Sequence, residues 1–367
     1  MPEELTYSLL ATALRGGCSA MPPRSEWPAL FALARAHGVL PLLADAAAAG
    51  RWDDAILHQM RPAVAAQTAL SIVRERELQR VLAALFQDGI VALLLKGAHL
   101  AFTIYPSPDR RPHVDTDLLI KEEDRAVVHR CLIGLDYELS HQVTGDVAFR
   151  QCHYEWVDRS GAMHTIDVHW RIANPLAFAE RLTFADLIAE AVPVPRLGPH
   201  ASAPCPKHAL LIACLHRTAH HGTSDRLLWL YDIHLLASVL TDRDWTALAE
   251  MAHDRGFAPV LAAGLEDTRE TLATNVPAEV LRTLRERAGH TDRDVLEFLE
   301  GAPSKLRVAA SDWRRLSGWR VRTRFLREHL FPSRTYMRQR YGVSSNAALP
   351  LLYLHRIVTG AWGWVRG

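Results

Sequence analysis

The sequence predicts an α+β fold in which a short strand-containing segment, residues 86–175, lies between helical regions at residues 1–85 and 176–367. Three observations predict it. Alanine, leucine and valine recur at helical spacing through the first 85 residues. Short apolar runs near residues 90–95 and 118–120 then indicate buried strands. Two further segments flank an Arg-Ser-Gly turn at residues 159–161 and indicate a hairpin, after which strand signals fade.

The first region contains helical periodicity in WPALFALARAHGVLPLLADAAAA and again in AILHQMRPAVAAQTALSIVRERELQRVLAALFQDG. Gly89 closes the second stretch, at a position typical of a helix C-terminus. We therefore expect several helices here, of which the last ends near Gly89.

The central segment alternates strands and helices. We expect IVALLLKG to form a buried strand, AHLAFTIY a helix, PSPDRRP a loop and VDTDLLI a second strand. KEEDRAVVHRCLIGL should be an amphipathic helix, because its first turn carries the acidic residues that the helix dipole favours. HYEWVD and HTIDVHW should pair as an antiparallel hairpin. The proline-rich stretch VPVPRLGPHASAPCP, beyond this segment, is expected to be a linker or an ordered loop.

The composition is that of a globular protein. The 367 residues are 49% hydrophobic and 23% charged, with a net charge of +1, and they suffice for two or three domains. The five cysteines show no paired spacing, which favours reduced thiols over a disulfide framework or a zinc site. The first residues are acidic where a signal peptide is basic, and no apolar run approaches the roughly 20 residues of a membrane span. We expect a cytoplasmic protein without a transmembrane segment.

Three carboxylates are the main chemical signal. Asp115 and Asp117 are two residues apart, so in an extended strand they point to the same face. Asp167, between Ile166 and Val168, belongs to a later strand. Convergent carboxylates repel one another unless a cation joins them, and oxygen ligands favour Mg²⁺, which usually keeps waters and substrate phosphates. The pattern therefore indicates metal-assisted phosphoryl or nucleotidyl transfer. In the alternative, Asp115 begins a turn and Asp117 forms a surface salt bridge.

The segment LLLKGAHLAFTIYPSPDRRPHVDTDLLI, with IDVHWRI after it, resembles a broad bacterial nucleotidyltransferase family with a KG…R…D-x-D-L-L pattern. That family has the DNA polymerase β-type fold, so the resemblance implies a small mixed sheet. HRTAHHGTSDRLLWLYDIHLLA resembles the family's downstream helical segment, and the likeness covers roughly residues 30–260. A weaker likeness extends to LFPSRTYMRQRYG. The general fold usually has Gly-Ser or Gly-Gly after its first strand, where this chain has Lys96-Gly97-Ala98.

The resemblance implies catalytic and metal-binding roles for the three carboxylates. Asp115 and Asp117 would bind the Mg²⁺ ion that carries the nucleoside triphosphate. Asp167 would complete a second metal position, and it would either lower the pKa of the attacking hydroxyl or take its proton.

Three further residues are candidates for binding the nucleotide. Gly97 would let the backbone approach a phosphate, and Lys96 would reach a phosphate as a point charge. Arg111 would neutralise the charge that develops on pyrophosphate. In the alternative, Lys96 and Gly97 form a strand-ending turn with a solvated lysine, and Arg111 is a solvated loop residue.

Histidines and a later charged pair complete the candidate site. His169 would share the face of Asp167, where it would orient that carboxylate or touch the acceptor, unless it is a half-buried structural histidine. Arg226 and Asp232 would contact the nucleotide or brace the strand segment. His216 and His220 have the spacing of a two-histidine metal pair, but without a glutamate between them we expect them to line the cleft.

Residues 313–340 contain nine arginines and one glutamate, interleaved with aromatic residues. Such a tract suits an anionic partner, such as RNA or a phosphorylated acceptor. The alternative is an amphipathic helix whose arginines pair with acids elsewhere in the chain.

We therefore expect Mg²⁺-dependent transfer of a nucleoside monophosphate from a nucleoside triphosphate, with ATP as the expected donor, and release of pyrophosphate. The acceptor would be a small molecule, a peptide or RNA. Two alternatives are a non-catalytic nucleotide- or RNA-binding module and a toxin-like transferase that modifies tRNA or protein.

Overall fold

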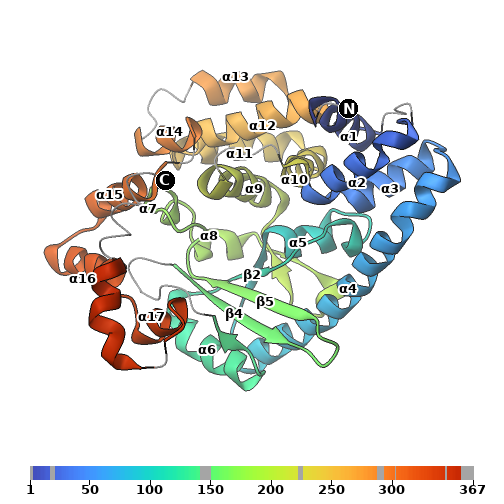
Figure 1. The fold of residues 1–367 in the computed structure, drawn as a ribbon. Helices are drawn as coiled ribbons and strands as arrows, with labels where there is room; N and C mark the ends of the chain where they lie inside the picture. Colours follow the sequence, from blue (N-terminus) through green and yellow to red (C-terminus); the bar gives the residue numbers. More distant parts are fainter. Residues whose placement is uncertain are drawn as a thin grey trace.

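The computed structural model describes residues 3–16, 21–140, 150–221, 226–286, 293–301, 303–343 and 345–356. Within these ranges, the strands form a seven-stranded mixed sheet in the order β3-β4-β5-β2-β1-β7-β6. Helices cover it on both faces (Figure 1). The predicted α+β class is therefore confirmed.

Four helices precede the sheet: α1 (Glu3–Leu14), α2 (Trp27–Ala36), α3 (Leu40–Ala49) and α4 (Asp54–Gln87). The Asp53 side chain caps the start of α4 by accepting a hydrogen bond from the backbone N–H of Ala55. After α4 ends at Gln87, Gly89 adopts a left-handed backbone with φ 76°. Such a glycine is favoured where a helix stops, as the sequence predicts.

The strands are short. They are β1 (Leu93–Leu95), β2 (Thr116–Leu119), β3 (Glu138–Leu139), β4 (Gln151–Val157), β5 (Met163–His169), β6 (Val192–Pro193) and β7 (Ser202–Ala203). The strands β1 and β2 are antiparallel, β2 and β5 are parallel, and β4 and β5 form the predicted antiparallel hairpin. The predicted helices between them are α5 (Lys96–Thr103) and α6 (Arg125–Gly134).

The proline-rich stretch departs from the expectation of a linker or loop. It contains β6 and β7, and β7 pairs in parallel with β1 through Ser202 and Leu93. Strands of two residues are too short to show alternation, and the proline in β6 suits the edge of a sheet, where no partner needs its missing N–H.

Further helices lie in the described C-terminal ranges, and α7 to α17 are the labelled ones. They are α7 (Leu176–Ala179), α8 (Phe184–Ala189), α9 (Pro206–His221), α10 (Leu227–Ser238), α11 (Asp242–Asp254), α12 (Ala258–Leu272), α13 (Ala278–Glu286), α14 (Arg293–Leu299), α15 (Lys305–Arg315), α16 (Trp319–Leu330) and α17 (Arg334–Arg340). No helix among the described residues is both long enough and apolar enough to span a bilayer. Within the described ranges, Cys131, Cys152, Cys205 and Cys214 form no disulfide, and Cys18 lies outside those ranges.

The sheet separates two hydrophobic cores. Leu93, Leu95 and Leu119 face a core that contains residues of both the N-terminal and the C-terminal helices. Leu94 and Leu118 face the opposite core, formed with α6 and the second half of α4. The long helix α4 therefore contributes to both cores (Figure 1). The domain boundaries near residues 85 and 175 stay a prediction.

Candidate active site

A row of polar side chains crosses the face of the sheet that looks toward the helical core. Asp117 on β2 lies directly opposite Leu95 on β1 and Asp167 on β5. Asp167 in turn lies opposite His153 on β4. Because directly paired residues project from the same face of a sheet, the strand register brings Asp117, Asp167 and His153 side by side.

Asp117, Asp167 and His169 form a compact group of potential metal ligands. Each offers one ligand atom, and these atoms all lie within 4.8 Å of one another. Two carboxylates and an imidazole leave room for water or substrate oxygens around a divalent ion, and carboxylate oxygens suit Mg²⁺ or Mn²⁺. The residues of this group therefore fit a divalent metal, and metal binding by Asp117 and Asp167 stays a prediction.

Asp117 is the most strongly bound of these carboxylates. It is 3% exposed, and its Oδ1 accepts hydrogen bonds from Lys96 Nζ at 2.6 Å and from His169 Nε2 at 2.8 Å. Burial alone would raise the pKa of Asp117, but Lys96 and His169 outweigh it and hold that pKa well below its usual range. Asp117 is therefore ionised at neutral pH, as a metal ligand must be. A surface salt bridge, the alternative for Asp117, does not describe this buried pair.

Asp115 lies outside the compact group. It is the residue before β2, it is exposed, and it lines a cavity beside the sheet. The protein around its carboxylate limits hydration and raises the pKa of Asp115, and the charges of Asp117 and Asp167 raise it further. His169 thus stands beside Asp117 and Asp167 where the sequence analysis expected Asp115. A metal-binding role for Asp115 stays a prediction.

Asp167 is bound on its other side by His153, a residue to which the sequence analysis gave no role in the site. His153 Nδ1 bonds to Asp167, and His153 Nε2 lies 2.9 Å from Glu155 Oε1. The hydrogen bond with Asp167 raises the pKa of His153 above its ordinary value. An imidazolium between the two carboxylates would hold Asp167 in one orientation.

The turn after β1 brings Lys96 and Gly97 to the site. Lys96 has a left-handed backbone, φ 50°, and its side chain is only 15% exposed, so it is not the solvated lysine of the alternative. A Cβ atom on Gly97 would lie 2.8 Å from Arg111 Nη1. The absence of a side chain at Gly97 therefore admits the guanidinium of Arg111, whereas the sequence analysis expected a phosphate there.

Arg111 joins the strand segment to the C-terminal helices. Its Nε and Nη2 donate to the two oxygens of Asp232 on α10 at 2.8 and 2.7 Å, and Tyr105 also donates to Asp232 at 2.7 Å. Arg111 is 6% exposed, so it is not a solvated loop residue. This bidentate pair is the bracing contact that the sequence analysis considered for Asp232.

A cavity of about 430 Å³ opens beside these residues. Its wall includes Asp115, Asp117, Lys96 and Arg111 from the strand segment and Arg226 from the C-terminal region. Arg35 from α2 and Arg74 from α4 also line it, as do Trp229 and His216 from the C-terminal helices. Cationic groups outnumber the carboxylates in this wall, which favours an anionic ligand. The side chain of His220 lies outside the described residues.

Comparison with known proteins identifies the family of the chain. Residues 23–273 match the family described as "Uncharacterised nucleotidyltransferase". The chain belongs to this nucleotidyltransferase family. No curated protein shows significant sequence similarity to the chain.

Every candidate site residue of this nucleotidyltransferase lies within the matched range. The range also includes four residues of the site that the sequence analysis did not assign: Arg35, Arg74, His99 and His113 line the cavity. Burial lowers the pKa of His99 to about 3, and burial together with the charges of Arg74 and Arg111 lowers the pKa of His113 to about 4. Both imidazoles are therefore neutral at pH 7 and are available as hydrogen-bonding groups without a charge.

The arginine-rich tract lies outside the matched range, on α15, α16 and α17. Arg314 and Arg315 both pair with Asp294 on α14, at 2.9 and 3.1 Å. Arg324 pairs with Glu328 of its own helix at 2.9 Å. These three arginines follow the alternative of pairing with acids of the chain, and an anionic partner for the tract stays a prediction.

Proposed function

We propose that this nucleotidyltransferase moves a nucleoside monophosphate from a nucleoside triphosphate, with ATP the expected donor, to an acceptor hydroxyl or similar group. The proposed core has a polymerase-β-like fold. One observation carries the proposal: Asp117 and Asp167 lie directly opposite each other on parallel strands, beside a cationic cavity. A Mg²⁺ ion held by Asp117 and Asp167, with Asp115 and His169 beside them, would stabilise the attacking and the leaving oxygen.

The two carboxylates have different neighbours. Asp117 lines the cavity with Lys96, so we place the triphosphate there, with the Lys96 ammonium and the Arg111 guanidinium close to its phosphates. Asp167 lies toward β4, next to His153, and its side chain is 13% exposed. We place the acceptor on that side. Donor and acceptor would then reach the cluster from opposite directions, as in-line displacement requires.

The reaction forms a bond between the acceptor oxygen and the α-phosphorus of the nucleotide. The bond between the α-phosphorus and its bridging oxygen to the β-phosphate breaks, and pyrophosphate leaves with the electron pair. Asp167 accepts the proton of the acceptor hydroxyl, while His153 holds the carboxylate in position. The cationic wall of the cavity stabilises the charge on the departing pyrophosphate.

Substitution of Asp117 tests this function. Asp117→Asn keeps the size of the side chain but removes the charge that would hold the metal. Several kcal/mol of metal-derived stabilisation are then lost, so Mg²⁺-dependent pyrophosphate release should fall by roughly 100-fold or more. Asp136→Asn is the matched control, because Asp136 is exposed and asparagine tolerates its left-handed backbone.

Two measurements together separate this function from its main alternative: calorimetry with Mg²⁺ and a non-hydrolysable triphosphate, and an assay of pyrophosphate release from ATP. Binding of the analogue by the wild type together with pyrophosphate release from ATP supports the enzyme. Binding without release in the presence of any acceptor would instead support a non-catalytic nucleotide-binding module. An unchanged rate in Asp117→Asn would refute the site assignment.

A further inference from the structure

Two arginines face the cavity from the helical regions on either side of the strand segment. Arg74 lies on α4, and Arg226 directly precedes α10. Both line the same cavity as Asp115 and Asp117. In the described part of the chain, neither guanidinium forms an ion pair with a carboxylate, whereas Arg111 in the same wall is fully paired with Asp232.

Part of each guanidinium has no partner among the described residues. The Nε atoms of Arg74 and Arg226 are buried, and no group in the described ranges accepts a hydrogen bond from either. Arg74 donates through Nη1 to the carbonyl oxygen of His113, and Arg226 lies over the Trp229 ring at 5.0 Å. Neither the carbonyl oxygen of His113 nor the ring of Trp229 carries a full negative charge. A partly buried cation without an ion pair is unfavourable, so an anion entering the cavity would be stabilised.

The charges around the cavity indicate the size of that anion. Asp117 is already paired with Lys96, and Asp232 with Arg111. Of the carboxylates in the cavity wall, Asp115 is the one left to balance the charges of Arg35, Arg74 and Arg226. Burial lowers the pKa of both Arg74 and Arg226, and the charge of Arg111 lowers that of Arg226 further, whereas Asp115 acts on both in the opposite direction and Asp232 does so on Arg226. Several unmatched cations around one space suit a polyanion.

We propose that Arg74 and Arg226 clamp the polyphosphate of the nucleotide between the two helical regions. This inference rests on the proposed function and extends it, because it assigns donor binding to helices outside the strand segment. A Cβ atom on Gly38 would lie 2.9 Å from Leu228 Cδ2 and 3.3 Å from Arg226 Nη2, so the lack of a side chain at Gly38 leaves room for both side chains. The two planar guanidinium groups would each hold phosphate oxygens through two N–H donors.

Inorganic tripolyphosphate, titrated calorimetrically without divalent metal, tests the clamp independently of catalysis. Arg74→Gln and Arg226→Gln should each weaken tripolyphosphate binding by about 10-fold or more, because each removes charge-assisted hydrogen bonds to phosphate. The double variant should weaken binding further. Arg76→Gln is the matched control: Arg76 is exposed on the same helix and should bind tripolyphosphate like the wild type.

A second measurement separates binding from a structural role. If Arg226 stabilised the fold, Arg226→Gln would lower the unfolding temperature. We expect that temperature to stay the same or rise, because the variant removes a partly buried cation that has no ion pair among the described residues. The conservative variants Arg74→Lys and Arg226→Lys should restore part of the affinity.

The outcomes distinguish failure of the clamp from failure of the proposed function. Wild-type protein that does not bind tripolyphosphate, or arginine variants that bind it normally, would overturn the clamp even if nucleotidyl transfer is observed. Loss of binding in both variants would establish the clamp even if no transfer is found. Asp117→Asn should retain tripolyphosphate binding while losing turnover.

Discussion

At the residue scale, one oxygen of Asp117 accepts hydrogen bonds from two neighbouring side chains. Asp117 Oδ1 accepts from both Lys96 Nζ and His169 Nε2. A metal ion bound by the same carboxylate would compete with the Lys96 ammonium for it, since like charges repel at such distances. Lys96 would then be free to turn toward a phosphate in the adjoining cavity.

Lys96→Met should therefore have opposite effects on two ligands. Removal of the ammonium should tighten Mn²⁺ binding in the absence of nucleotide by roughly 5-fold or more, because a competing charge is lost. The same change should weaken binding of a non-hydrolysable Mg²⁺–triphosphate complex, because a phosphate contact is lost. Calorimetry measures both affinities.

Lys121→Met provides the control for this pair of measurements. Lys121 follows β2 in the chain and is exposed, so its replacement should leave both affinities unchanged. If Lys96→Met binds Mn²⁺ no more tightly than the wild type, the ammonium does not compete with a metal at Asp117.

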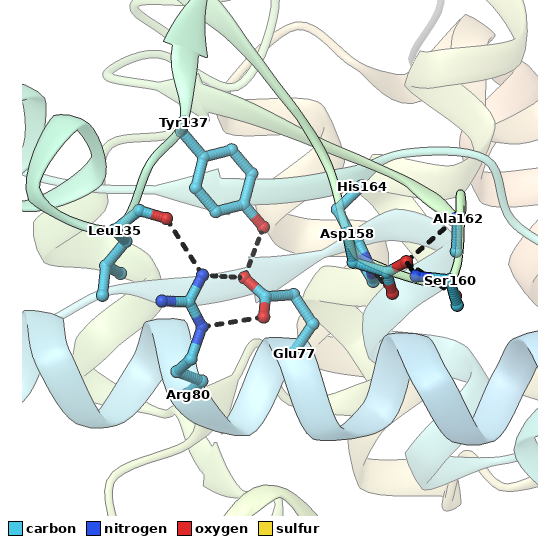
Figure 2. A network of polar contacts seen from close by, with 8 residues as sticks. All are labelled: Glu77, Arg80, Leu135, Tyr137, Asp158, Ser160, Ala162 and His164. Atoms are coloured by element: carbon cyan, nitrogen blue, oxygen red, sulfur yellow. Dashed lines mark hydrogen bonds and ion pairs between the residues drawn. The ribbon is translucent and has the colours of Figure 1, made fainter.

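At the element scale, α4 is fastened to the far side of the sheet by a buried glutamate. Figure 2 shows Glu77 beside Arg80 and the hydroxyl of Tyr137. Arg80 Nε and Nη2 each lie 2.8 Å from a different oxygen of Glu77, and Tyr137 donates to Glu77 Oε1 at 2.8 Å. Arg80 also donates to the carbonyl oxygen of Leu135 at 3.0 Å. Arg74 is three residues from Glu77, so this contact fixes the part of α4 that lines the cavity.

Tyr137→Phe should destabilise the protein without changing its fold. The variant removes a hydrogen bond to a buried carboxylate, which should lower the free energy of unfolding by about 1–2 kcal/mol. Urea unfolding measures this difference. Tyr231→Phe is the matched control, because the Tyr231 side chain makes ring contacts with Tyr105 and His234 that phenylalanine would retain. Equal stability of Tyr137→Phe and the wild type would show that the Glu77 contact does not fasten α4.

The hairpin beside the site is closed by a second polar cluster, also drawn in Figure 2. Asp158 accepts from the backbone N–H groups of Ser160 and Ala162 at 2.8 and 3.0 Å and lies 3.2 Å from His164 Nε2. These bonds hold the turn between β4 and β5, and thereby the register that sets Asp167 opposite His153.

At the scale of the whole molecule, the sequence predicts the parts of the site that depend on local pattern. Alternation along a strand places Asp167 and His169 on one face, and the family resemblance supplies the order of the strands. The clamp arginine Arg74 could not be predicted, because an arginine on an amphipathic helix has the same local pattern whether it is solvated or buried against a cavity. The packing of α4 on the sheet decides between them, and that packing involves residues distant in sequence.

Two other differences between the predicted and the observed site also arise from contacts between residues distant in sequence. The contact between Gly97 and Arg111 links a turn to a loop 14 residues later, and no local signal reports it. The sequence pattern places Asp115 and Asp117 together, but β2 begins only at Thr116, so Asp115 precedes the strand and lies at the cavity. Strand ends are set by hydrogen bonds to neighbouring strands, which the sequence of one segment does not contain.

The fate of the α-phosphorus tests the central claim most directly. Wild-type protein and Asp117→Asn are each incubated with Mg²⁺ and a heat-treated cell extract as the source of acceptors, once with ATP labelled at the α-phosphorus and once with ATP labelled at the γ-phosphorus. Nucleotidyl transfer predicts that wild-type protein attaches the α-label to an extract component, that the γ-label is released in pyrophosphate, and that Asp117→Asn does neither. Attachment of the γ-label, or equal attachment of the α-label by Asp117→Asn, would contradict it.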